Sequence, residues 1–316
     1  MSIYVTNDLH GNKELNKVVI NSIINTMVAS DTLIINGDGA GARGPLMNKL
    51  VKIFYEVRRG ETDKECLIEA LTEIIKERPD IPDSWIYDSV HAGVFRAVIA
   101  NHYDLFQQCT EKEVFQVLEE TLLPLSQAAR EKGIDVIYSS GNGEIVLSDF
   151  FVEDITKEKI LPPEKRFYQK LVKEGYFSRL GIQYVPYAFN LLNKVAIIGT
   201  NLLDIDFAQA MELLSRQGLL NGDGKLKAIV VHYPPAISPL GKIFGFWSPN
   251  KIDRARINAL DKIIQTLQPN NTPIYFGHIH LSPNDPGMAI YPPLLGFHLG
   301  NRYSFWVKPG EVIKID

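Results

Sequence analysis

Short apolar runs rich in β-branched residues recur along this 316-residue chain, and each run ends in glycine or polar residues. Runs of about four to eight such residues are typical of buried strands. Amphipathic stretches suited to helices separate several runs, for example at 14–28 and 253–267. This alternation predicts an α/β fold built in layers, and the alternating segment 303–315 predicts a closing β-hairpin around Pro309-Gly310. The predicted buried strands are 3–10, 32–38, 135–142, 195–201, 228–233 and 273–280.

Two segments interrupt the alternation within what we expect to be a single domain of residues 1–316. Residues 45–132 have a largely helical pattern dense in Glu, Lys and Arg, which predicts a helical insertion. Because both of its ends adjoin strands that finish in candidate ligands, we expect it to cap the site and shape substrate choice. A shorter insertion is predicted at 150–190. Its basic residues suit either a solvated helix face or a rim that attracts phosphate. They are Lys157, Lys159, Lys165, Arg166, Lys170 and Lys173.

Charge and composition restrict the partners and the compartment. A net charge of -4 argues against a broad basic surface, so a small soluble substrate is favoured over extended nucleic acid. The two cysteines, Cys66 and Cys109, lie in predicted helices without CxxC spacing, as expected of reduced core thiols. Neither an export signal nor an apolar run of about 18 residues is visible, so we expect a cytoplasmic protein without a membrane segment.

Residues able to bind metals gather at the ends of the predicted strands. Asp8 and His10 stand two apart at the end of the first strand, a spacing that points strand side chains to one face. His278 and His280 repeat this spacing at the end of the sixth predicted strand. Open α/β sheets place their ligand sites at the carboxyl ends of strands. The other strand ends contribute Asp38, Asn142 and His232.

Any one of these groups has a structural explanation, such as a buried aspartate that accepts a hydrogen bond from a neighbouring histidine. That explanation would have to hold at five strand ends together. Two carboxylates, one amide oxygen and four imidazoles suit manganese, iron, zinc or nickel, whereas calcium sites use fewer imidazoles. The sequence therefore predicts a centre for two divalent metal ions.

In their order these motifs resemble the calcineurin-like metallophosphoesterase superfamily, over nearly the whole chain outside the two insertions. The opening block Asp-Leu-His-Gly-Asn, at 8–12, is similar to the small phosphodiesterase and dinucleotide-polyphosphatase branches. The resemblance implies a sandwich of two mixed sheets flanked by helices, with activity as a phosphatase or phosphodiesterase. The matching motifs are Asp8-x-His10, Gly37-Asp38, Gly141-Asn142, His232 and Gly277-His278-x-His280.

The resemblance also implies a role for each residue. Asp38 would bridge the two metals, and Asn12 would help to hold the phosphate. Asp38, Asn142 and His232 are the expected catalytic residues. Two metals about 3.5 to 4 Å apart can share a hydroxide as nucleophile and clamp a phosphoryl group for in-line attack. The expected ligands are Asp8, His10 and His280 for one metal, and Asn142, His232 and His278 for the other.

The chain departs from the family's pattern directly after Asn142. The family usually has a histidine there, which stabilises the transition state or protonates the leaving oxygen, but this chain has Gly143. Three alternatives stay open: an acid from elsewhere, a substrate that needs none, and a protein that only binds. Arg43 suits either a side chain that holds a phosphate oxygen or a solvated loop arginine, and Glu144 would orient the end of the Asn142 strand or an imidazole. Substitute acids to consider are His91, His102 and His298, each of which also suits a structural role.

Two other functions fit parts of the sequence. Residues 39–44, Gly-Ala-Gly-Ala-Arg-Gly, match the GxGxxG spacing of dinucleotide-binding loops and lie between a predicted strand and a predicted helix. The acidic strand end that should follow about 20 residues later is missing, which opposes this function. A catalytically silent regulator would keep the fold and engage a partner protein through the helical insertion. Gly143 favours such a regulator, and the complete ligand set opposes it.

Overall fold

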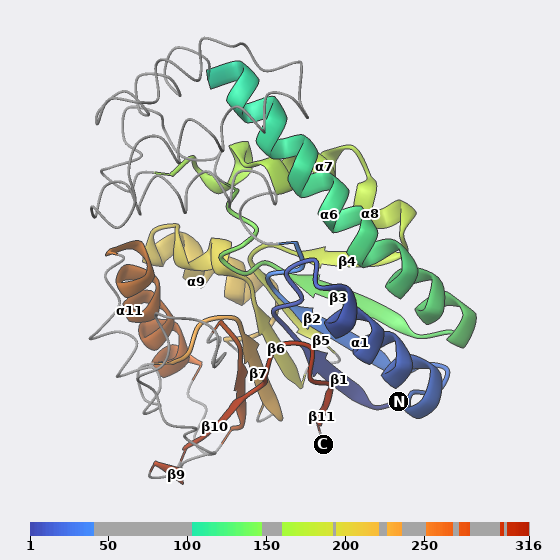
Figure 1. Cartoon of the computed structure of the whole chain (residues 1–316). Helices are drawn as coiled ribbons and strands as arrows, with labels where there is room; N and C mark the ends of the chain where they lie inside the picture. Colours follow the sequence, from blue (N-terminus) through green and yellow to red (C-terminus); the bar gives the residue numbers. More distant parts are fainter. Residues whose placement is uncertain are drawn as a thin grey trace, which may run out of the picture.

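The chain is described here from a computed structural model, and its two sheets lie between helices (Figure 1). The described residues confirm the mixed α/β class and are consistent with an α/β sandwich. For residues 103–110, 251–253, 298–299 and 302–303 the description covers the backbone only. The structure describes residues 1–40, 103–146, 160–191, 194–220, 226–235, 251–267, 272–278, 298–299 and 302–315.

The first sheet has five strands and is mostly parallel. β1 to β4 run parallel, and β11 closes the edge antiparallel to β1. In order across the sheet the strands are β11 (Ile313–Ile315), β1 (Ile3–Thr6), β2 (Thr32–Asn36), β3 (Asp135–Ser139) and β4 (Ile182–Val185).

The second sheet has six strands around a parallel centre. β6, β7, β8 and β10 are parallel, whereas β5 and β9 lie antiparallel at the two edges. The order is β5 (Ala188–Leu191), β6 (Val195–Ile198), β7 (Ala228–Val231), β8 (Ile274–Phe276), β10 (Arg302–Trp306) and β9 (His298–Leu299).

Successive strand residues divide between two cores, as the period of two along a strand requires. Ile34 and Ile137 of the first sheet meet Ile197 of the second in a core between the sheets. Their neighbours Ile35 and Tyr138 face helices instead. Both faces of each sheet are therefore covered, which explains why these strands are continuous apolar runs.

Two groups of helices cover the outer faces of the sheets, and Figure 1 shows them on opposite sides of the molecule. The first sheet packs against α1 (Lys13–Thr26), α6 (Tyr103–Lys132), α7 (Phe167–Lys173) and α8 (Tyr176–Arg179). The second packs against η4 (Thr200–Leu203), α9 (Phe207–Arg216) and α11 (Lys251–Thr266).

The six predicted strands are all present, and each ends earlier than predicted, because the polar residues that follow lie beyond the paired segment. The helices expected at 14–28 and 253–267 are α1 and α11. β4 and β5 were not predicted; they lie at the end of the predicted insertion at 150–190, with β5 reaching Leu191, and form one edge of each sheet. This segment therefore contributes to the framework of the fold.

The predicted closing hairpin at 303–315 is wrong. β10 belongs to the second sheet and β11 to the first, so the two strands do not pair. The chain crosses between the sheets through Val307, which lies in the core between them. Asn7 holds the crossing, because its Nδ2 donates to the Val307 carbonyl at 2.8 Å and its carbonyl accepts from Gly310 N at 3.0 Å. Alternation in a sequence shows a strand's two faces but does not identify its partner.

The predicted helical insertion is described only over its last part, where α6 begins at Tyr103. Buried residues of α6, including Leu118 and Leu125, join the core that covers the first sheet. Residues 45–102 lie outside the described residues, so the cap stays a prediction. Cys109 lies in α6, as expected of a helix, and Cys66 lies outside the description. Among the described helices, none combines the length and the apolar content needed to cross a membrane.

Candidate metal centre

Six of the seven predicted ligands come together at the carboxyl ends of parallel strands. They lie on loops that follow β1, β2 and β3 in the first sheet and β7 and β8 in the second. His280 falls outside the described residues. Side-chain and backbone contacts connect all six, which are Asp8, His10, Asp38, Asn142, His232 and His278.

The acidic side of this centre consists of Asp8, Asp38 and His10. Both aspartates are buried, with exposed fractions of 0% and 1%. His10 Nε2 lies 3.7 Å from Asp8 Oδ1 and 3.5 Å from Asp38 Oδ2. Burial alone would lower the pKa of His10, but its hydrogen bond with Asp8 and the charges of both carboxylates raise that pKa to about 9. The pair of carboxylates thus strongly favours a cation between them.

The imidazole side consists of His232, His278 and Asn142. Asn142 Oδ1 lies 2.7 Å from His232 Nε2 and 2.5 Å from His278 Nδ1, and these two ring nitrogens are 3.2 Å apart. His232 Nδ1 lies 2.9 Å from the backbone carbonyl of Asn36. A carbonyl accepts only, so Nδ1 carries a proton, and loss of the proton on Nε2 would present that nitrogen's lone pair to the centre.

Asp38 connects the two sides. Its Oδ2 faces His10, and its Oδ1 lies 3.5 Å from His232 Nε2. Asp8, Asp38 and His232 each offer one ligand atom, and these atoms all lie within 4.8 Å of one another. Burial would lower the pKa of His232, but the charges of Asp38 and Asp8 outweigh it and raise that pKa. One carboxylate therefore serves both halves of the centre.

The backbone at four of these residues is held in the left-handed region. The φ angles are 52° at Asp8, 46° at His10, 55° at Asp38 and 68° at His278. Ser30 is the other non-glycine residue with positive φ in the described part of the chain. Such conformations cost about 1–3 kcal/mol each and gather where function requires a fixed geometry.

This geometry corrects the reason given above for the Asp8 and His10 spacing. β1 ends at Thr6, so neither side chain lies on the strand and strand alternation does not direct them. Hydrogen bonds to the next loop position them instead. Asp8 N donates to the Gly37 carbonyl at 3.3 Å, and His10 N donates to the Asp38 carbonyl at 2.8 Å.

Glycines allow the loops to approach this closely. A Cβ on Gly37 would lie 2.7 Å from His232 Nδ1, at a residue whose φ is +83°. A Cβ on Gly277 would lie 2.6 Å from Asp8 Oδ2. The glycines that precede Asp38 and His278 are therefore required by space, and their φ or contacts explain the Gly-Asp and Gly-His motifs.

Glu144 holds two of the ligand loops together. Its carboxylate accepts from Asp38 N at 3.0 Å, from Gly39 N at 3.2 Å and from Gly141 N. Tyr138 donates its hydroxyl to the same carboxylate. Burial and the nearby Asp38 raise the pKa of Glu144, and burial with Glu144 raises the pKa of Tyr138, which therefore keeps its proton. The expected orienting role is thus directed at the loops of Asp38 and Asn142.

The residues present fit a pair of divalent metal ions. Two ring nitrogens and the Asn142 oxygen lie within 3.2 Å of one another on one side. Two buried carboxylates meet on the other, and imidazole with carboxylate and amide oxygen suits manganese, iron, zinc or nickel. A proton or a metal ion between such groups removes their mutual repulsion.

The positions of the remaining predicted residues say less about their roles. Asn12 caps the start of α1, because its Oδ1 accepts from Glu14 N at 2.9 Å and from Leu15 N at 3.2 Å. Its role in holding phosphate stays a prediction. His298 lies in β9, where the backbone alone is described. Arg43, His91 and His102 lie outside the described residues.

The glycine-rich segment at 39–44 is described only at its start. Gly39 N donates to Tyr138 Oη at 3.0 Å as well as to Glu144. This N–H group is therefore already used inside the protein, whereas a dinucleotide fingerprint would offer such groups to a pyrophosphate. Residues 41–44 lie outside the description.

Arg166 corrects the interpretation of the basic segment. It is buried, with an exposed fraction of 2%, and belongs to neither a solvated face nor a phosphate-attracting rim. Its Nη1 donates to Asp204 Oδ2 at 2.9 Å, and Arg256 binds the same carboxylate with two bonds of 2.7 and 3.0 Å. Lys170 instead pairs with Glu111 at 2.8 Å, and Lys157 and Lys159 lie outside the description.

Tyr233 connects this arginine cluster to the metal centre, and the sequence analysis missed it. Its hydroxyl accepts from Arg256 Nη1 at 2.9 Å, and its ring centroid lies 4.4 Å from that of His278. The sequence signal for Tyr233 is its position directly after His232. Asp204 and Arg256 gave none, since isolated charged residues in helical or loop segments are ordinarily exposed.

Comparison with known proteins adds little to this geometry. No protein-family model matches the chain, and no curated protein matches it. One solved crystal structure is similar with a TM-score of 0.45 and 11% identity, over 99% of this chain and 94% of that one. At this TM-score the likeness carries no argument about fold or function.

Proposed function

We propose that this chain is a two-metal-dependent hydrolase of phosphate esters or anhydrides, acting on a small soluble substrate. The observation that carries the proposal is the position of Asp38. Its two carboxylate oxygens lie 3.5 Å from His10 Nε2 and 3.5 Å from His232 Nε2, on opposite sides of the centre. A carboxylate shared in this way is what two neighbouring divalent ions require.

The geometry supports one set of ligands for each ion. Two divalent ions bound there would act as Lewis acids toward a phosphoryl group and generate a nucleophile from water at neutral pH. Asp8 and His10, together with His280 from outside the description, would hold the first. Asn142, His232 and His278 would hold the second, and Asp38 would contribute to both.

The residues around the ligands fix them before substrate arrives. His232 is held by the Asn36 carbonyl, and Asp8 Oδ2 accepts from His278 N at 2.9 Å. Gly143 N donates to Asp38 Oδ1 at 2.6 Å. Preorganised polar groups of this kind stabilise charge that develops on phosphoryl oxygens without further rearrangement.

Gly143 shapes the expected substrate preference. Its position offers a backbone N–H group to Asp38 and no side chain that could protonate a leaving oxygen. Phosphate leaving groups, with a second pKa of about 6, depart as stable anions and need little protonation. Anhydrides and activated esters are therefore the substrates this site suits best, ahead of alkyl phosphomonoesters.

A substrate screen tests the proposal. Nucleotides, dinucleotide polyphosphates, sugar phosphates and bis(4-nitrophenyl) phosphate would be offered with manganese to the wild type and to Asp38→Asn. We expect turnover of at least one class and its loss in the variant. Asp31→Asn is the matched control, because Asp31 is also buried but receives Ser2 N and Val28 N and no predicted ligand. Equal activity in wild type and Asp38→Asn would exclude the site.

A catalytically silent binding protein is the second candidate function, and Gly143 is the observation that favours it. Such a protein would keep the ligands and bind metals without turning over any phosphate ester. Metal binding with no activity across the whole screen would identify it. Manganese-dependent turnover lost in Asp38→Asn would set it aside.

A further inference from the structure

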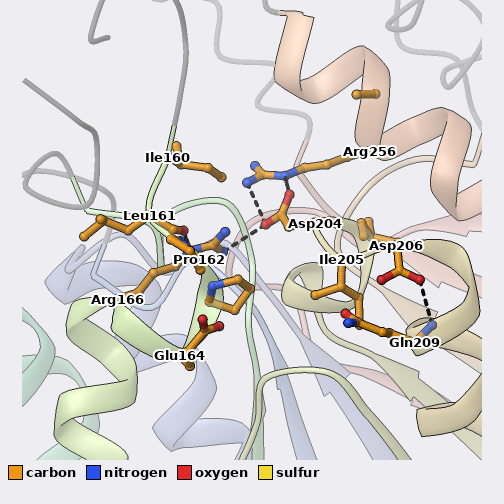
Figure 2. A pocket seen from close by; sticks show the side chains of 13 residues that line it. Ile160, Leu161, Pro162, Glu164, Arg166, Asp204, Ile205, Asp206, Gln209 and Arg256 are labelled. Atoms are coloured by element: carbon orange, nitrogen blue, oxygen red, sulfur yellow. Dashed lines mark hydrogen bonds and ion pairs between the residues drawn. The ribbon is translucent and has the colours of Figure 1, made fainter. Parts of the chain in front are cut away.

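A cavity of about 600 Å³ lies beside the arginine cluster (Figure 2). One side of it is formed by residues 160–166, which include η3 (Pro163–Lys165). The opposite side is the turn between η4 and α9, and Ala255 and Arg256 of α11 complete it. Cavities of about 300–1,000 Å³ are of the size that binds small molecules.

The polar part of the cavity is built from buried charges. Arg166 and Arg256 have exposed fractions of 2% and 3%, and both bind the Asp204 carboxylate. Arg166 also donates to Leu161 O at 2.9 Å and Asn201 Oδ1 at 2.7 Å. Within the described part of the chain, these hydrogen bonds and that of Arg256 to Tyr233 use three N–H donors on each guanidinium, and a guanidinium has five. Donors therefore remain on both arginines in the described part of the chain.

The rest of the cavity is apolar with an acidic edge. Pro162, Pro163, Leu203 and Ile205 provide hydrocarbon surface. The arginine cluster has one excess positive charge, and the exposed Glu164 and Asp206 place two negative charges at the edge. An anion would meet these carboxylates and a cation would meet the guanidinium groups, so an uncharged ligand fits best. Donors at the floor and acceptors at the edge suit a group that has both acceptor and donor atoms.

Hydrogen bonds connect the two arginines of the cavity to the loops of His232 and Asn142. Arg256 donates to Tyr233, whose ring contacts His278 and lies 5.7 Å from His232 between centroids. On the other side, Arg166 binds Asn201, and neighbouring Thr200 Oγ1 donates to the Gly141 carbonyl at 2.7 Å, directly before Asn142. A molecule in the cavity would therefore contact arginines that are connected, through Tyr233 and through Asn201 with Thr200, to the residues that would hold the second metal.

We propose that this cavity binds the organic group of the substrate, and that this group is an uncharged planar heterocycle such as a nucleobase. This assignment rests on the proposed function, because it makes the cavity part of the same site. The ring packs against the proline and leucine surface, its acceptor atoms receive guanidinium N–H groups, and its exocyclic amino group donates to the acidic edge. Hydrocarbon surface with donors and acceptors at separate places suits such a ring.

Binding of nucleosides without phosphate tests the assignment. Adenosine, guanosine, cytidine and uridine would each be titrated by calorimetry into the full chain with a metal chelator present. We expect at least one to bind with Kd of about 1 mM or tighter. Ala255→Trp, which fills the cavity from an exposed helical position, should weaken binding at least about tenfold, a loss of roughly 1.4 kcal/mol. Ala208→Trp is the matched control, because Ala208 is an exposed α9 residue outside the lining.

A second variant protects the test against misfolding. Gln209 is exposed and lines the cavity, so Gln209→Ala should weaken nucleoside binding while preserving the fold. No binding by any of the four nucleosides, or binding unchanged in Ala255→Trp and Gln209→Ala, would overturn the assignment. Competition between inorganic phosphate and a nucleoside for binding, measured with the chelator present, would also overturn it. The protein could bind a nucleoside, lose that binding in Ala255→Trp, and yet hydrolyse no phosphate ester. This result would support the cavity as a binding site for the heterocycle and contradict only the proposed function.

Discussion

Two clusters of buried charge lie on either side of Tyr233, and the chain compensates them differently. At the metal centre, the structure surrounds Asp38 with imidazole rings and backbone N–H groups. In the arginine cluster, three guanidinium bonds from Arg256 and Arg166 bind Asp204. The imidazole rings of the first set can lose a proton as the pH rises, and the guanidinium groups of the second cannot.

This difference indicates which cluster is built to exchange its cation. Burial alone would raise the pKa of Asp204, but Arg256 and Arg166 outweigh it and lower that pKa, so its counter-charges are permanent parts of the fold. The raised pKa values of His10 and His232 show carboxylates compensated by protons. Metal ions replace protons at such groups, whereas they cannot replace an arginine.

The same substitution at each cluster should have opposite consequences, and the effect on metal binding is the largest we expect. Asp38→Asn removes the charge shared by both metals, so manganese affinity should fall at least about 100-fold, beyond the 10–100-fold typical of lost partners to ligands. The free energy of unfolding of the metal-free variant should change little, because the substitution also removes a buried negative charge that lies next to the Glu144 carboxylate. Calorimetric manganese titration and urea unfolding measure the two quantities. Unchanged affinity would contradict the bridging role.

Asp204→Asn should give the reverse pattern. It leaves two buried guanidinium groups without their shared carboxylate, and breaking a buried ion pair from one side costs about 3–5 kcal/mol. Manganese stoichiometry should stay that of the wild type in the folded protein. Urea unfolding and metal analysis of the same sample provide the check. A stability equal to that of the wild type would show that the arginines are compensated by other groups.

The pH dependence of manganese affinity should distinguish the two clusters by a smaller effect. His10 has a pKa raised to about 9 in the metal-free fold. Its stabilising contribution is fully present below its unfolded pKa of about 6.5 and is lost as pH rises through about 9. Metal ions need the neutral ring, so manganese affinity should increase between about pH 6.5 and 9, by up to about tenfold per unit for each proton released.

Calorimetry in buffers of different ionisation enthalpy counts those protons. His10→Gln should release fewer protons than the wild type and show a flatter pH profile. Affinity independent of pH over this range would mean that protons do not compensate the carboxylates.

The smallest expected effect concerns Gly143. Gly143→His restores a side chain where the site has only an N–H group to Asp38. A positioned general acid is worth roughly 10²–10⁴ in rate, so even partial placement should raise turnover of alkyl esters several-fold, and that of anhydrides less. Single-turnover rates on both substrate types are the measurement. If the wild type already hydrolyses both at similar rates, another residue is the acid, and His91, His102 and His298 should then be replaced in turn.

The strands and the ligand set were predictable from the sequence because both depend on local pattern. Apolar runs gave the strands, and polar residues just after them gave six residues that the structure brings together. The arginine cluster was not predictable, since Arg166 and Arg256 are 90 residues apart in number and their burial depends on one aspartate between them. The partner of β11 was also hidden, because alternation in 303–315 fits a hairpin and two separate edges equally well. Pairing between residues far apart in the sequence leaves no signal in the local residue pattern.

Stoichiometric reactivation tests the two-metal account most directly. The full chain would be stripped of metal with a chelator, and manganese would be added in sub-equivalent steps while hydrolysis of bis(4-nitrophenyl) phosphate, or of the best substrate from the screen, is followed. The account predicts negligible turnover without metal and a rate that rises until about two ions are bound per chain, because Asp38 serves two sites. Turnover that survives chelation, or that is complete with one ion per chain, would contradict it.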